Sequence, residues 1–292
     1  MNDKKKHVSA SLLDSSLISQ TKDKIYTHKI VECGDYYQVY NYQDRKIKKD
    51  KNMVKMNDIK IVNTDTLSKK ENVNKIKTIE LKNIYRSMFA LQRIVKANEN
   101  EFKTFVTLTF AENIKTIEEA NKSFNSFRTY IKKLKNDFKY VCVPEFQKRG
   151  AVHYHLLTNI NYTDFKLLSK EEKKLYNPST KKNQIGRNIV GWNKGFSFVK
   201  DITDMNVVGY LTKYMTKDID NRLWGKRRYL YSMNLKQPKT IYIDINTDSD
   251  NSKLSFIELF YKEKFKNIYC DKLGQIIEFN EYKKGDVILC TK

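Results

Sequence analysis

Apolar residues follow two different spacings along this chain, and each spacing predicts one kind of secondary structure. They recur every three or four residues over 83–97 and 117–138, which is typical of helices with one buried face. Thr116 and Glu119 stand at the start of the second helix in the pattern of a capping box. Shorter apolar or alternating runs predict strands, which we place at 25–42 (as a hairpin), 103–110, 140–146, 151–158 and 195–202.

The order of these elements predicts the fold class. A strand, a helix, two strands, a polar insertion over 160–191, a further strand and a helix over 207–218 follow one another. This order predicts an α+β fold, in which an antiparallel sheet has helices packed on one face. Apolar positions after residue 250 predict an accessory helix with strands. We therefore expect three parts: a basic N-terminal extension (1–75), a central domain (76–245) and an accessory C-terminal segment (246–292).

Composition adds an expectation about partners. The 292 residues include 56 Lys and Arg against 34 Asp and Glu, a formal net charge of +22. Such an excess favours a nucleic acid or another anionic partner. The four cysteines show neither metal-binding nor disulfide spacing. No signal peptide and no apolar run of membrane-spanning length occurs, so we expect a cytoplasmic protein that does not contact membranes.

The segment 140–158 predicts a hairpin with candidate chemistry on its second arm. His153 and His155 are one residue apart, and side chains at this spacing on a strand point to the same face. Glu145 lies near the end of the first arm and can reach the pair. Two imidazoles and one carboxylate suit a catalytic divalent cation better than a closed structural zinc site. Two merely packed or solvated histidines fit the spacing as well, and Glu145 could instead support a histidine ligand from behind.

A second pattern lies in the predicted helix over 207–218. Its apolar row, which includes Leu211, can face the core. Another face carries two phenols and two ammonium groups at positions i, i+3, i+4 and i+7. These residues are Tyr210, Lys213, Tyr214 and Lys217. A phenol is a poor nucleophile near neutral pH, and a neighbouring cation favours the reactive phenolate. An amphipathic surface helix with extended lysines would show the same pattern.

Three motifs, taken in order, resemble those of the HUH endonucleases, which are rolling-circle replication initiators. They are FVTLTF (105–110), HYHLL (153–157) and YLTKYMTKD (210–218). The stretches VPEFQKRGAVHYH, WNKGFSFVK and KRRYLYSMNLKQPK are similar to phage and plasmid Rep proteins grouped with the filamentous-phage replication endonuclease. The resemblance covers roughly 80–245. It implies an RRM-like (ferredoxin-like) palm and makes the central domain the endonuclease domain.

The resemblance also implies roles for individual residues. In that family a histidine pair and an upstream acidic residue hold Mg²⁺ or Mn²⁺, and a tyrosine attacks single-stranded origin DNA. These roles fall on His153, His155, Glu145 and Tyr214. Lys213 and Lys217 would stabilise the phenolate or the transition state. Tyr210 would be a second nucleophile, or a side chain that contacts DNA or packs. The implied products are a 5′-phosphotyrosyl link and a 3′-OH that primes rolling-circle replication of a plasmid or phage in a bacterial cell.

Basic and aromatic residues interleave after the tyrosine motif, in a pattern typical of contact with a DNA strand. The candidates are Arg222, Trp224, Lys226, Arg227 and Arg228. A surface loop around one buried tryptophan would also fit. The chain has no G-x-x-x-x-G-K-[ST] motif, so we expect strand separation to come from a host helicase or from DNA supercoiling.

Two other functions compete with origin nicking. A relaxase or transposase would use the same chemistry, but relaxases place the tyrosine before the histidines, whereas here it follows them. A single-strand transposase shares the order found here. A non-catalytic nucleic-acid-binding protein with an RRM-like sheet is the third candidate, and the aromatic RRM signature is absent.

Overall fold

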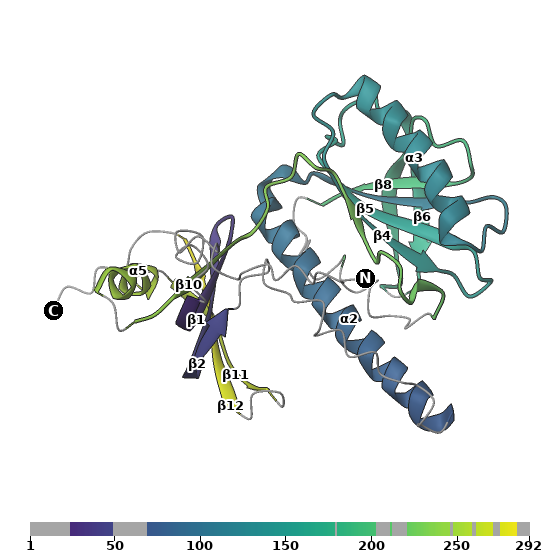
Figure 1. Ribbon diagram of the computed structural model, residues 1–292. Helices are drawn as coiled ribbons and strands as arrows, with labels where there is room; N and C mark the ends of the chain where they lie inside the picture. Colours follow the sequence, from purple (N-terminus) through teal and green to yellow (C-terminus); the bar gives the residue numbers. More distant parts are fainter. Residues whose placement is uncertain are drawn as a thin grey trace, which may run out of the picture. The chain divides into compact units, whose positions relative to one another are not determined.

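The computed structural model describes residues 24–48, 69–178, 180–202, 211, 221–245, 248–258, 261–270 and 275–284. The chain divides into two compact units, one built around residues 64–239 and the other from residues 1–31, 37–63 and 240–292, while the turn 32–36 groups with the first. The described residues form two antiparallel sheets and three α-helices, which confirms the α+β class (Figure 1). In this part of the chain, no helix is both long and apolar enough to cross a membrane.

The smaller unit contains one sheet, in which strands from the N-terminal part of the chain pair with strands from its C-terminal part. Its strand order is β10-β1-β2-β12-β11. The predicted hairpin over 25–42 and the predicted accessory helix and strands are all confirmed. Buried apolar residues from β1, β2, β10, β12 and the helix form one core cluster. The elements are β1 (Lys24–Cys33), β2 (Tyr36–Lys48), β10 (Lys239–Ile243), α5 (Asp248–Glu258), β11 (Tyr261–Cys270) and β12 (Gln275–Lys283).

The larger unit contains a seven-stranded sheet in the order β6-β7-β8-β3-β5-β4-β9. The region 160–191, which we expected as a polar insertion, instead forms the edge hairpin β6–β7. Most side chains of β6 are exposed or half-buried, so the hairpin lacks the apolar run by which a buried strand is recognised. The strands are β3 (Thr104–Thr109), β4 (Tyr140–Phe146), β5 (Val152–Thr158), β6 (Leu168–Asn177), β7 (Lys182–Ile189), β8 (Ser197–Asp201) and β9 (Leu230–Tyr231).

Helices cover both faces of this sheet, whereas the sequence pattern predicted helices on one face (Figure 1). Helix α3 (Ile117–Leu134) shares a core cluster with Leu108, Cys142 and Tyr154. The C-terminal part of α2 (Lys69–Ala97) shares a second cluster with the alternate strand positions, among them Phe105 and Val143. All seven residues of β4 are buried. Its apolar run, interrupted only by Glu145, is the sequence signal for burial on both sides.

Helix α3 begins where the sequence predicted, but it lacks the predicted capping bond. It ends at Leu134, about one turn before the predicted end at Phe138. Thr116 is the N-cap residue, and its side chain makes no capping hydrogen bond. Its carbonyl accepts the first helical hydrogen bond, from the Ala120 amide at 3.1 Å. Glu118 and Glu119 lie in the first turn, where their negative charge interacts favourably with the helix dipole.

Replacing Phe124 with alanine should lower the free energy of unfolding by about 3–5 kcal/mol, the usual cost of emptying a large buried aromatic position. Phe124 is fully buried, and its ring centre lies 5.5 Å from that of Tyr140 and 5.0 Å from that of Tyr154. Urea unfolding measures the change. Lys133→Ala, on the exposed face of the same helix, should change stability by less than about 0.5 kcal/mol. Equal losses in the two variants would contradict this packing.

Candidate functional site

Strand register brings His153, His155 and Glu145 together. Glu145 on β4 lies directly opposite His153 on β5 in the antiparallel ladder. His155 follows two residues later on β5, so both imidazoles and the carboxylate project from one face of the sheet. This is the face that α2 partly covers, because Val143 and Leu157 in the same alternation belong to its cluster.

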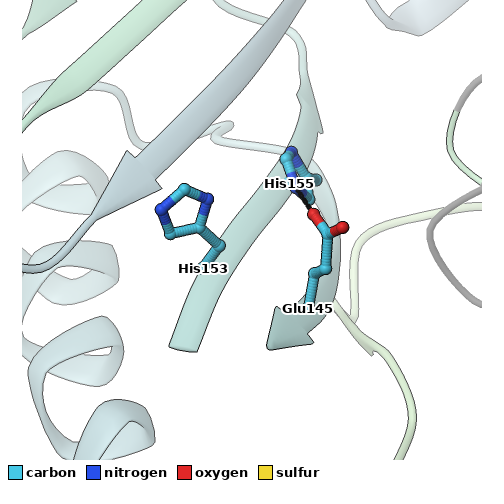
Figure 2. A group of neighbouring side chains, drawn as sticks. All are labelled: Glu145, His153 and His155. Carbon is cyan, nitrogen blue, oxygen red and sulfur yellow. Dashed lines mark hydrogen bonds and ion pairs between the residues drawn. The ribbon is translucent and has the colours of Figure 1, made fainter. Parts of the chain in front are cut away.

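The three side chains lie close together, and two of them, His155 and Glu145, are in direct contact. The Nε2 atom of His155 lies 2.6 Å from a carboxylate oxygen of Glu145 (Figure 2). One potential ligand atom from each of the three residues falls within 4.8 Å of the other two. His155 is 5% exposed and Glu145 is 9% exposed, while His153 is half-buried. The Nε2 atom of His153 is itself buried, so the group lies largely out of contact with solvent.

Strand β3 supports the histidines from the other side. Thr107 lies opposite His155 in the ladder, and its Oγ1 is 3.4 Å from Nδ1 of that ring. The Phe105 ring stacks on His155 with a centre-to-centre distance of 5.7 Å and an interplanar angle of 20°. Contacts on both sides restrict the imidazole to one orientation. Neither residue belongs to a motif that marks it as functional, although the alternation in FVTLTF already places both on one face.

The donor set fits a divalent cation. Two imidazole nitrogens and one carboxylate oxygen within 4.8 Å of one another can bind one ion, and three protein ligands leave coordination positions open. The 2.6 Å hydrogen bond between His155 and Glu145 holds two of the three groups together, and a bound cation would replace its proton. Within the described part of the chain, this is the group of potential ligands that meets these distances.

Tyr154 stands between the two histidines in sequence but faces the other way. It is fully buried in the α3 cluster, and its hydroxyl donates a hydrogen bond of 2.7 Å to Oδ1 of Asn121. Burial raises the pKa of its phenol well above the ordinary value. Burial raises the pKa of Tyr140 as well. Neither phenol can supply a phenolate to the histidine face.

Of the predicted tyrosine helix (207–218), the structure describes only Leu211. Tyr210, Tyr214, Lys213 and Lys217 lie outside the described residues, so their roles stay predictions. Leu211 is described as helical and is fully buried. It belongs to the same cluster as Phe105, Val143 and Leu157, on the face that carries the histidines. The sequence predicted this leucine to face the core, and that prediction is confirmed.

The basic and aromatic segment after the tyrosine motif is divided between exposed and buried positions. Arg222 is exposed, its guanidinium lies 3.6 Å from the centre of the Phe146 ring, and it donates to the Gly150 carbonyl at 3.1 Å. Arg227 is exposed too, and Lys226 pairs with Glu118 at 2.8 Å. Arg228 is 7% exposed and forms an ion pair with Glu80 of α2 at 2.9 Å, so its charge is neutralised within the protein. The remaining candidate, Trp224, is half-buried.

Comparison with known proteins supports the sequence resemblance. Residues 103–219 match the family model of the replication-associated protein ORF2/gene II protein. The matched segment spans β3 to β8, contains the histidine pair and Glu145, and continues through the tyrosine motif. No curated protein and no solved structure matches the chain. The resemblance to phage-type replication initiators is therefore confirmed over residues 103–219, which are similar to the replication-associated family of ORF2 and gene II protein.

Replacing either histidine with alanine should weaken Mn²⁺ binding by at least about tenfold, because losing even a supporting group at a metal site has an effect of this size. Isothermal titration calorimetry on His153→Ala, His155→Ala and Glu145→Ala measures it. Glu119→Ala removes an exposed carboxylate from α3 and should bind Mn²⁺ like the wild type. Unchanged affinity in all three site variants would rule out a cation at this group.

Proposed function

We propose that this protein is an HUH endonuclease that nicks single-stranded origin DNA and starts rolling-circle replication of a plasmid or phage. The observation that carries the proposal is the convergence of His153, His155 and Glu145 on one face of an antiparallel sheet, inside a segment of the replication-associated family. The proposed palm consists of the central strands β8, β3, β5 and β4 with α3 behind them. Leu211 supports a position of the tyrosine motif beside the same face.

In this proposal the three side chains hold Mg²⁺ or Mn²⁺. A cation bound there would polarise the scissile phosphate and offset its negative charge. Two neutral imidazoles and one carboxylate offset only one of the two charges of a divalent cation. The occupied site would therefore keep a net positive charge, which suits an anionic substrate. Thr107 and Phe105 keep His155 in a fixed orientation, and Glu145 lies against the same ring. Side chains fixed before the substrate arrives need no reorganisation during the reaction.

Tyr214 is the proposed nucleophile. Its phenolic oxygen attacks the phosphorus in line and forms a 5′-phosphotyrosyl bond, while the bond from phosphorus to the leaving 3′ oxygen breaks. The phenolic proton is lost to solvent, and the departing oxygen takes up a proton to become the 3′-OH that a polymerase extends. Lys213 and Lys217 would favour the phenolate. Because the covalent link conserves the phosphodiester, a second transfer can rejoin the strand without ATP, and Tyr210 is the candidate for that step.

The proposed DNA contacts follow from charge and exposure. The exposed cations Arg222, Lys226 and Arg227 lie in the segment just after the tyrosine motif, and the chain carries a formal net charge of +22. Binding should therefore weaken steeply as salt rises. A host helicase remains the expected partner for strand separation.

Tyr214→Phe should abolish a covalent protein–DNA adduct, because phenylalanine lacks the attacking oxygen. The assay incubates the purified protein with single-stranded origin DNA of its own replicon and Mn²⁺, and it separates products on a denaturing gel. EDTA should abolish the adduct in the wild type as well. Tyr210→Phe is the matched control and should retain the first cleavage.

Loss of the adduct only in Tyr210→Phe would exchange the roles of the two tyrosines. Tight DNA binding with neither cleavage nor adduct in any metal would contradict the proposal and favour a non-catalytic binding protein. Cleavage of transfer or transposon ends, with no cleavage of the replication origin, would favour the relaxase or transposase alternative.

A further inference from the structure

A second group of side chains lies on the histidine face of the sheet, two strands away from the histidines. Phe198 on β8 lies opposite Thr107, which lies opposite His155. One step along, the Thr109 amide donates to the Phe196 carbonyl at 2.8 Å, and Thr109 lies opposite His153. With neighbouring strands about 4.8 Å apart, both phenylalanines lie on the order of 10 Å from the histidines.

Gly195 fixes the position of Phe196. A Cβ atom at Gly195 would lie 2.3 Å from the Thr109 carbonyl oxygen and 2.4 Å from the Ala111 nitrogen, so only glycine permits this approach. The Ala111 amide donates to the Lys194 carbonyl at 2.9 Å and closes the contact. The backbone at Phe196 is thereby held at the end of β3, and the residue remains 43% exposed.

Lys173 on β6 places a positive charge against this ring. Its ammonium nitrogen lies 3.9 Å from the centre of the Phe196 ring and 5.9 Å from that of Phe198. It donates to Oδ1 of Asn188 and to the Ser197 carbonyl. An ammonium has three N–H donors, and these two bonds leave one donor for a ligand within the described part of the chain. Burial lowers the pKa of Lys173, an effect that an approaching phosphate would oppose.

We infer that Phe196 and Lys173 form a nucleotide subsite for single-stranded DNA, in which the Phe196 ring stacks on a base and the Lys173 ammonium donates to the adjoining phosphate. The inference rests on the proposed function, since it takes the nucleotide to neighbour the one whose phosphate lies at the histidines. Stacking on an aromatic ring tolerates any base, because every base has a π face. The subsite therefore positions the strand without reading its sequence.

Packing of the edge hairpin onto β8 does not by itself account for this arrangement. A ring that served only to anchor Lys173 would be expected to be buried, as Phe198 is at 6% exposed. Phe196 instead keeps a large exposed area on the face that carries the proposed cation site. A fixed ammonium beside an exposed ring matches the two chemical parts of a nucleotide, its phosphate and its base.

The test measures binding of a labelled single-stranded oligothymidylate by fluorescence anisotropy, in EDTA so that no strand is cut. Phe196→Leu should weaken binding about tenfold, as expected for loss of one stacked base. Lys173→Gln should weaken it about fivefold and lower the slope of log affinity against log salt by about one. The controls Tyr176→Leu and Lys174→Gln remove an exposed aromatic and a charge from the opposite face of β6, and both should bind like the wild type.

Mn²⁺ affinity, measured on the same variants, reports whether the sheet remains intact and should not change. Wild-type DNA affinity in Phe196→Leu would overturn the subsite, and if the wild type still forms its covalent adduct, the proposed function would stand. Equal weakening in Tyr176→Leu would also overturn it, because the effect would not be specific to one face. Loss of binding in Phe196→Leu, in a protein that forms no adduct, would support the subsite and reject the nicking chemistry.

Discussion

The register of three neighbouring strands is the constraint on which the rest of this site depends. Thr109, His153 and Glu145 lie opposite one another across β3, β5 and β4. Side chains on a strand alternate between faces, so a slip of one residue in β5 would turn both histidines toward α3 and bring Tyr154 to the other face. The large apolar cluster under α3, which includes Tyr154, opposes such a slip. Packing on one face thus fixes the chemistry on the other.

The same register makes one face of the sheet a hydrophobic core and places the candidate cation ligands on the other. The α3 side is closed by aromatic side chains and supplies stability. The other side is closed at one end by α2 and Leu211, and it presents polar groups where the apolar cover ends. His155 lies at this boundary, stacked on Phe105 and in contact with Glu145. A nearly buried imidazole next to a half-buried one suits a site that must hold an ion firmly.

Much of this arrangement could be predicted from the sequence, because local patterns determine it. A hairpin alone is enough to bring the H-x-H pair and the preceding carboxylate together, and β4 and β5 form this hairpin. The edge strands β6 and β7 were not predicted, since their lysine and glutamate side chains resemble those of a solvated loop. Phe196 and Lys173 are more than twenty residues apart and meet only through the pairing of β6, β7 and β8. Placement of a helix on each face also depends on long-range packing. The largely apolar sequence of β4 indicates that both faces are covered, but not which elements cover them.

Anomalous X-ray scattering from crystals containing Mn²⁺ would locate a bound cation directly. We expect a strong manganese peak bounded by the imidazoles of His153 and His155 and the carboxylate of Glu145. In the His155→Ala protein this peak should weaken or vanish. A peak elsewhere, or none at these three side chains at a saturating Mn²⁺ concentration, would show that they do not form a cation site.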